Sequence, residues 1–150
     1  MPPVKELLCS PPALFLLPAL IHLASGLYFS TFFTAPWWYP APLLFTAGAI
    51  FGLSAVLKFH KSRISPLPWQ NNRTRLFTDG IYGISRNPMY VSLLLLLTGC
   101  GLLSSAYLIP LTLPLFAGCI HMIIIKEERN NLQNFGDEYL EYCRKTRRWL

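Results

Sequence analysis

Two long stretches without a charged side chain dominate this sequence of 150 residues. From Glu6 the next charged residue is Lys58, and none lies between Arg86 and Lys126. Apolar residues make up 53% of the chain, charged residues only 13%, and the mean hydropathy is +0.38. Apolar blocks of about 18 residues or more are typical of membrane-spanning helices. The sequence therefore predicts an all-α, multi-pass membrane protein and excludes disordered chains and disulfide-built secreted domains.

Each uncharged stretch is too long for one membrane crossing, so each is expected to form a hairpin of two helices. A hydrocarbon core of about 30 Å takes about 20 helical residues at about 1.5 Å each. Three prolines within 34–42 interrupt the first stretch, beside an aromatic cluster that suits the membrane interface. Small and polar residues near Ser104 mark the second turn. We expect four spans, at about 12–33, 42–59, 88–104 and 107–125, within a single domain that covers residues 1–150.

The positions of the basic residues predict the orientation in the membrane. All 13 lysines and arginines lie in the N-terminal tail, within 58–86 or within 126–148, and neither proposed outer turn contains one. Because short loops rich in Lys and Arg stay in the cytoplasm, we expect both termini and the central loop to be cytoplasmic. The net charge of +6 then indicates contact with anionic lipid headgroups rather than nucleic acid. A single lysine before the long first apolar stretch favours a mature helix over a cleaved signal peptide.

The four cysteines indicate neither a metal site nor a disulfide. Cys9, Cys100, Cys119 and Cys143 lack the close spacing of metal ligands, and two of them lie within predicted spans. Cys143 is expected in the cytoplasm, where thiols stay reduced. We therefore expect no metal.

Chemistry is expected in two cytoplasmic segments, 70–90 and 126–148. In the first, Asp79-Gly80 is a turn signal, and Arg86-Asn87-Pro88 begins the third helix. The free N–H groups at that helix start suit an anionic or polar ligand. The alternative is a connecting loop whose arginine only marks the membrane surface.

The second segment places two carboxylates, Glu127 and Glu128, directly after a predicted span. Carboxylates are costly next to hydrocarbon, which indicates that they have a partner. Four apolar residues recur at intervals of three and four and predict one stripe along a cytoplasmic interfacial helix, with Gly136 a candidate for an interruption. They are Leu132, Phe135, Tyr139 and Tyr142. Taken alone, this segment is also consistent with an amphipathic tail whose acids are solvated.

Together the two segments resemble the membrane-embedded methyltransferases that include the isoprenylcysteine carboxyl methyltransferases and the phospholipid methyltransferases. The family's first signature is Gly-x-Tyr followed by Arg-His/Asn-Pro-x-Tyr, and it appears as Gly80-Ile81-Tyr82 and Arg86-Asn87-Pro88-Met89-Tyr90. Its second is a Glu pair followed by Leu, Phe-Gly and two tyrosines, and it appears as Glu127-Glu128, Leu132, Phe135-Gly136, Tyr139 and Tyr142. The resemblance covers the chain from about Gln70 onwards.

The resemblance implies S-adenosylmethionine as the methyl donor and a lipophilic acceptor that arrives through the bilayer. Glu127 is the implied partner of the cofactor's ammonium group. Arg86 and Glu128 are the implied catalytic residues. The implied cofactor-binding positions are Gln70, Thr74, Arg75, Leu76, Phe77, Tyr82, Asn87, Pro88, Met89, Tyr90 and Glu127.

The acceptor stays open at this level. The prenyl-protein enzymes have an arginine where this chain has Ile123, and a histidine where it has Asn87, so a prenylcysteine acceptor is less favoured than in those enzymes. A phospholipid amine or a small thiol is the alternative. Such an acceptor must lose a proton, and Glu128 or His121 would be the residue that accepts it. Two further alternatives are an inactive membrane scaffold and a nicotinamide-dependent enzyme of lipid reduction, although no glycine-rich dinucleotide fingerprint is present.

Overall fold

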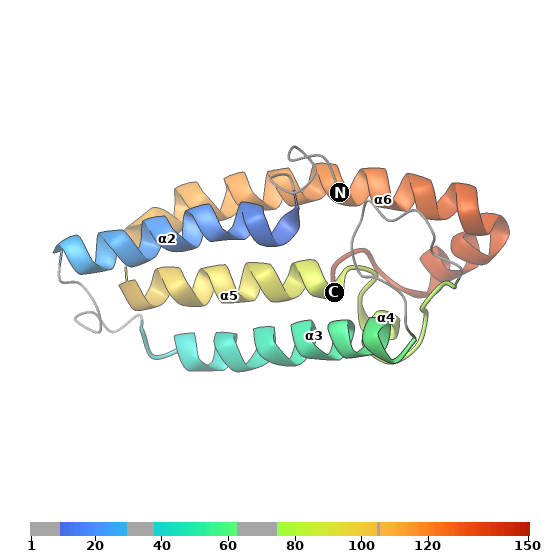
Figure 1. The fold of residues 1–150 in the computed structure, drawn as a ribbon, viewed down its shortest axis with the longest axis horizontal. Coiled ribbons are helices and arrows are strands. Elements are labelled where there is room, and N and C mark those ends of the chain that lie inside the picture. Colours follow the sequence, from blue (N-terminus) through green and yellow to red (C-terminus); the bar gives the residue numbers. More distant parts are fainter. Residues whose placement is uncertain (1–9, 30–37, 63–74, 105) are drawn as a thin grey trace.

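The computed structural model is all-α and describes residues 10–29, 38–62, 75–104 and 106–150. Its elements are α2 (Pro11–Phe29), α3 (Ala41–Lys61), α4 (Ile81–Ile84), α5 (Pro88–Ser104), the short 3-10 helix η2 (Ala106–Leu108) and α6 (Ile109–Lys145). The four long helices alternate in direction, so that α2 and α5 run one way and α3 and α6 the other (Figure 1). The ends of α3 and α6 and the start of α5 therefore lie at one end of the bundle.

Most of the expected helix limits agree with the structure to within two residues. The helix Pro88–Ser104 has the expected range, and Ala41–Lys61 begins one residue before the expected 42 and ends two after 59. The first helix is described to Phe29, and the rest of its expected range lies outside the described residues. The largest difference is α6, which begins after η2 and continues far beyond residue 125 without a break at the expected membrane surface.

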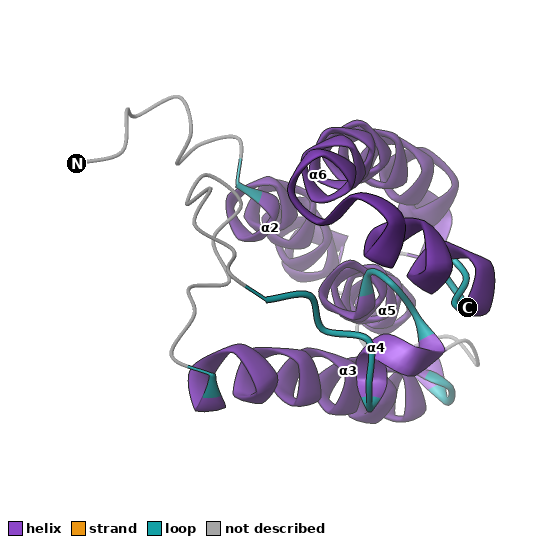
Figure 2. Ribbon diagram, turned by 90° about the vertical axis from the view of Figure 1, so that its right-hand side faces the viewer, coloured by secondary structure: helices purple, strands orange, loops and turns teal. Residues whose placement is uncertain are grey.

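Three of the helices, α2, α3 and α6, are long and apolar enough to cross a membrane. The fourth, α5, has 17 residues and would span only about 25 Å at about 1.5 Å per residue. This shorter helix packs against α2, α3 and α6, and it lies between them when the molecule is seen end-on (Figure 2). The chain is therefore an integral membrane protein built around a central apolar helix.

Small residues bring α3 and α5 into close contact. A Cβ atom on Gly48 would lie 2.9 Å from Cγ of Leu96, so only glycine fits there without a shift. The Ser92 hydroxyl donates a hydrogen bond to the Gly48 carbonyl at 2.7 Å. Small residues and interhelical hydrogen bonds are the usual means of helix packing in membranes. This contact fixes α3 against α5 and so positions Phe59, near the end of α3, beside the start of α5.

A buried polar pair links α2 to α6. His22 is fully buried, and its Nε2 lies 2.9 Å from the hydroxyl of Thr112. That hydroxyl donates to the Leu108 carbonyl at 2.9 Å, so its oxygen accepts from Nε2. The sequence indicated no partner for His22, because Thr112 is 90 residues away. The pair is a structural contact within the bundle.

Gly136 divides α6 into two parts. Its backbone angles, φ 50° and ψ −123°, are non-helical and lie in the positive-φ region that favours glycine. The residues that follow turn back towards the bundle (Figure 1). The predicted interruption at Gly136 is confirmed, and the expected apolar stripe does not continue across it: Leu132 is exposed, whereas Tyr139 and Tyr142, on the returning part, are buried.

Candidate functional site

A cavity opens at the end of the bundle where α3 ends and α5 begins. It holds about 480 Å³ of space, including its open mouth. Its walls come from the end of α3, from the segment before α5 and from both parts of α6. The lining residues are Phe59, Arg75, Leu76, Phe77, Tyr82, Arg86, Asn87, Glu127, Glu128, Asn131, Phe135, Tyr139 and Tyr142. The cavity thus combines aromatic rings with two carboxylates and two arginines.

One wall of the cavity is aromatic. Phe59, Phe77 and Tyr82 are buried together, with ring centroids 5.1 to 6.1 Å apart. The guanidinium carbon of Arg75 lies 5.9 Å from the centroid of the Phe77 ring, a distance typical of a cation–π contact. This wall offers apolar and π surface to a flat or cationic ligand.

The segment that carries this wall is tied to α3 by an ion pair. Lys58 donates a hydrogen bond to Asp79, and this bond is the main reason why the pKa of Asp79 lies below its usual value. Gly80 follows with a φ of 62°, which allows the chain to turn into α4. The turn predicted from Asp79-Gly80 is confirmed, and it directs Tyr82 inwards.

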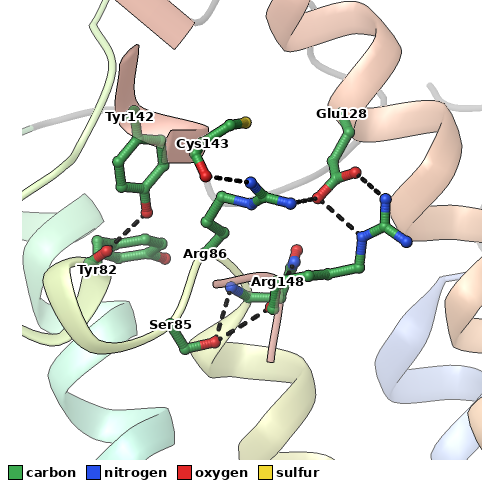
Figure 3. A network of polar contacts seen from close by, with 8 residues as sticks. Tyr82, Ser85, Arg86, Glu128, Tyr142, Cys143 and Arg148 are labelled. Atoms are coloured by element: carbon green, nitrogen blue, oxygen red, sulfur yellow. Dashed lines mark hydrogen bonds and ion pairs between the residues drawn. The ribbon is translucent and has the colours of Figure 1, made fainter. Parts of the chain in front are cut away.

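Two buried tyrosines close the other side. The hydroxyl of Tyr142 donates to the Tyr82 carbonyl at 2.6 Å and so joins the returning part of α6 to α4 (Figure 3). Burial raises the pKa of Tyr142 and, together with the charge of Glu128, that of Tyr139. Both phenols therefore stay protonated near neutral pH and are hydrogen-bond donors rather than bases.

The two adjacent carboxylates have different partners. The hydroxyl of Tyr90, in the first turn of α5, donates to Oε1 of Glu127 at 2.9 Å. Glu128 lies between two arginines (Figure 3). Its Oε1 accepts from Arg86 at 3.0 Å and from Nε of Arg148 at 3.1 Å, and its Oε2 accepts from Arg148 at 2.6 Å. Glu128 is thus held on both oxygens by arginines, and Glu127 accepts from the Tyr90 phenol.

The residues that follow α6 form part of this arrangement. The main-chain N–H of Arg86 donates to the Arg147 carbonyl at 3.0 Å. The Arg148 carbonyl accepts from the Asn87 side chain at 3.0 Å. It also accepts from the Ser85 hydroxyl at 3.3 Å (Figure 3). Trp149 packs against the bundle core. The segment 146–150 is therefore docked onto the start of α5.

The structure brings most of the predicted site residues together. Those that line the cavity are Arg75, Leu76, Phe77, Tyr82, Arg86, Asn87, Glu127 and Glu128. Pro88 and Met89 lie behind the wall, and Met89 packs against the aromatic cluster. Gln70 and Thr74 lie outside the described residues. Arg148 was not predicted as a site residue, because its charge was interpreted only as part of the basic cytoplasmic tail.

Arg86 offers a direct test of which ligand would fit. One terminal nitrogen of its guanidinium donates to the Cys143 carbonyl at 3.4 Å and the other to Glu128. Its Nε is buried and has no hydrogen-bond partner among the described residues. A buried donor without an acceptor is costly, and a ligand carboxylate would satisfy it. With Glu127 nearby, the cavity fits a ligand that carries both a carboxylate and an ammonium group.

Comparison with known proteins places the chain in a family. The sequence model of the phospholipid methyltransferases (PEMT) matches residues 39–138, two thirds of the chain. The chain belongs to the phospholipid methyltransferase family. Members of this family are S-adenosylmethionine-dependent methyltransferases and group with the isoprenylcysteine-methyltransferase-like membrane enzymes, so the resemblance noted from the motifs is confirmed. Comparison with curated proteins and with solved structures found no match.

The family assignment fixes the chemistry in outline. This member of the phospholipid methyltransferase family is a membrane enzyme that uses S-adenosylmethionine. The family and the apolar helices together imply a lipid environment and a lipid acceptor. The matched range includes α3, α4, α5 and α6 as far as residue 138. Arg148 lies beyond it.

Proposed function

We propose that the cavity is the S-adenosylmethionine site and that methyl transfer to a lipid acceptor takes place at its mouth. The observation that carries this proposal is the pairing, in one cavity, of the Glu127 carboxylate with the unsatisfied Nε of Arg86. These groups suit the ammonium and the carboxylate of the cofactor's amino-acid part. The aromatic wall of Phe59, Phe77 and Tyr82 suits its adenine ring and sulfonium.

The residues of the site have a positioning role in this proposal. When bound, S-adenosylmethionine supplies a methyl group already activated by its positive sulfur, so the protein has mainly to align donor and acceptor. Glu128 is held by two arginines, and the phenols of Tyr139 and Tyr142 are protonated. With Glu127 assigned to the cofactor, no carboxylate of this wall is left to accept a proton. An acceptor that has already lost its proton to water is therefore favoured.

We infer that the acceptor is a lipid whose nucleophile lies among the headgroups. The family match supports a lipid acceptor. Ile123, at the position of the substrate-contacting arginine of the prenyl-protein enzymes, packs against the bundle core. It therefore offers no charge to a prenylcysteine carboxylate, which favours a headgroup amine over that substrate.

Label transfer distinguishes these acceptors. Purified protein in detergent, incubated with methyl-labelled cofactor, is expected to label the lipid fraction of vesicles that contain aminophospholipid. Parallel samples contain a prenylcysteine analogue or a small thiol. Label in the prenylcysteine ester would overturn the inference from Ile123, and label in none of them, with cofactor bound, would contradict an active lipid methyltransferase. Thermal stabilisation by NADPH but not by S-adenosylhomocysteine would contradict the assigned cofactor.

We further propose that the chain is one domain of four crossings, with both termini and the cavity in the cytoplasm. The alternation of helix directions and the one-sided distribution of Lys and Arg support this orientation. A cysteine-reactive, membrane-impermeant probe is expected to label a cysteine placed beside Trp38 from outside the cell. A cysteine placed beside Arg144 should be labelled only after permeabilisation, in a background without the native cysteines. Labelling of both positions from the same side would require an even number of crossings between them and would contradict the three that α3, α5 and α6 provide.

A further inference from the structure

We propose that Arg148 is a positioning residue that keeps the Nε donor of Arg86, unpaired among the described residues, available to the cofactor. This inference rests on the proposed function of the cavity. Arg148 does not line the cavity itself and lies outside the part of the chain that matches the family. It acts through Glu128, which it contacts with both Nε and a terminal nitrogen.

The main chain around Arg148 is held in place by contacts that do not involve its side chain. Its carbonyl accepts from Asn87 and Ser85, and the preceding carbonyl accepts from the N–H of Arg86. Trp149 anchors the next position in the core. These contacts hold the Arg148 main chain beside the start of α5, and from there its side chain reaches Glu128 (Figure 3).

The reason for a second arginine lies in the geometry of the first. A guanidinium and a carboxylate prefer a bidentate pair, in which two N–H groups meet two oxygens. Arg86 makes only one bond to Glu128, from a terminal nitrogen to Oε1, while its Nε has no partner among the described residues. Arg148 accounts for this difference, because it occupies Oε2 and shares Oε1.

Without Arg148, Glu128 would be free to rotate and to take both donors of Arg86. Nε would then be paired with Glu128, and the cofactor carboxylate would have to displace it. The side chains of Arg86 and Glu128 are 12% and 16% exposed, so water competes little for either group. Arg148 is 36% exposed, which allows substitution there without leaving a deeply buried gap.

The test compares Arg148→Met and Arg148→Lys with Arg144→Met, which removes one charge from an exposed position near the same end of the chain. The measurements are the Kd for S-adenosylhomocysteine, by calorimetry on the full chain in detergent, and the kcat and KM for the labelled cofactor. Arg148→Met is expected to raise Kd and KM about tenfold, the loss typical of a charge-assisted contact, with a smaller change in kcat. Lysine keeps the charge but makes a single ammonium contact instead of the bidentate contact of a guanidinium. The Kd and KM of Arg148→Lys should therefore lie between those of Arg148→Met and the wild type. Arg144→Met should match the wild type.

A double-mutant cycle separates positioning from general support of the fold. In a Glu128→Gln background, Arg148→Met is expected to change Kd by less than about twofold, because the competing carboxylate charge is already gone. A wild-type Kd in both Arg148 variants, or an equal loss in both backgrounds, would overturn the inference. If the wild-type protein binds no S-adenosylhomocysteine, the proposed function fails and this inference with it, whereas normal wild-type binding with unaffected Arg148 variants contradicts this inference alone.

Discussion

Replacing Glu127 with glutamine is expected to weaken the binding of S-adenosylhomocysteine by about 1.5 to 3 kcal/mol, the scale of a hydrogen bond to a charged group. The substitution removes the negative charge opposite the cofactor's ammonium. The amide oxygen of glutamine can still accept the hydrogen bond from Tyr90, so the wall of the cavity should keep its shape. Calorimetry on the purified protein in detergent measures the effect.

The matched control for this variant is Glu141→Gln, which removes a carboxylate from the exposed face of the returning part of α6. Its affinity for S-adenosylhomocysteine should equal that of the wild type. If Glu127→Gln is folded and binds equally well, Glu127 does not contact the cofactor, and Glu128 becomes the remaining acidic candidate in the cavity wall.

Replacing Glu128 with alanine is expected to lower the free energy of unfolding by about 3 kcal/mol, as when one partner of a buried ion pair is removed. The Arg86 side chain, 12% exposed, would lose its counter-charge and would face Arg148 instead. Because Arg148 can turn partly towards water, we expect a loss of stability at the lower end of the range known for buried ion pairs. Unfolding in mixed micelles with increasing denaturing detergent measures this loss.

Glu138→Ala serves as the comparison, since Glu138 is exposed on the same helix. It should leave the unfolding transition nearly unchanged. An unchanged transition in Glu128→Ala would show that Arg86 finds another acceptor, and it would contradict the view of Glu128 as the link between the two arginines.

The sequence was most informative where a single local rule determines the structure. Absence of charge predicted the long apolar helices, and Pro88 marked the start of α5 correctly. The paired motifs identified the family, because order and spacing survive in the linear chain. The membrane surface, by contrast, was a poor guide to the end of a helix. α6 continues past the first charges because leaving the hydrocarbon removes no backbone hydrogen bond.

The polar contacts of the site depend on residues that are distant in the sequence. The hydrogen bond between Tyr142 and Tyr82 joins positions 60 residues apart, and Asn87 contacts Arg148 across 61. No spacing rule relates such pairs. The role of Arg148 was hidden for a second reason, since a cluster of basic residues near a membrane already has a sufficient explanation in topology.

The length of α6 also determines how far the cavity wall extends beyond the apolar part of the bundle. At about 1.5 Å per residue, the helix rises about 15 Å between Lys126, where the charges begin, and Gly136, where the chain turns back. The residues after Gly136 return towards Glu128, and the Cys143 carbonyl and the Glu128 carboxylate both accept from Arg86. The two parts of α6 therefore hold the cavity at a fixed distance from the apolar helices. With the cavity as the proposed cofactor site, the acceptor atom has to lie at that distance, as an atom of a lipid headgroup can.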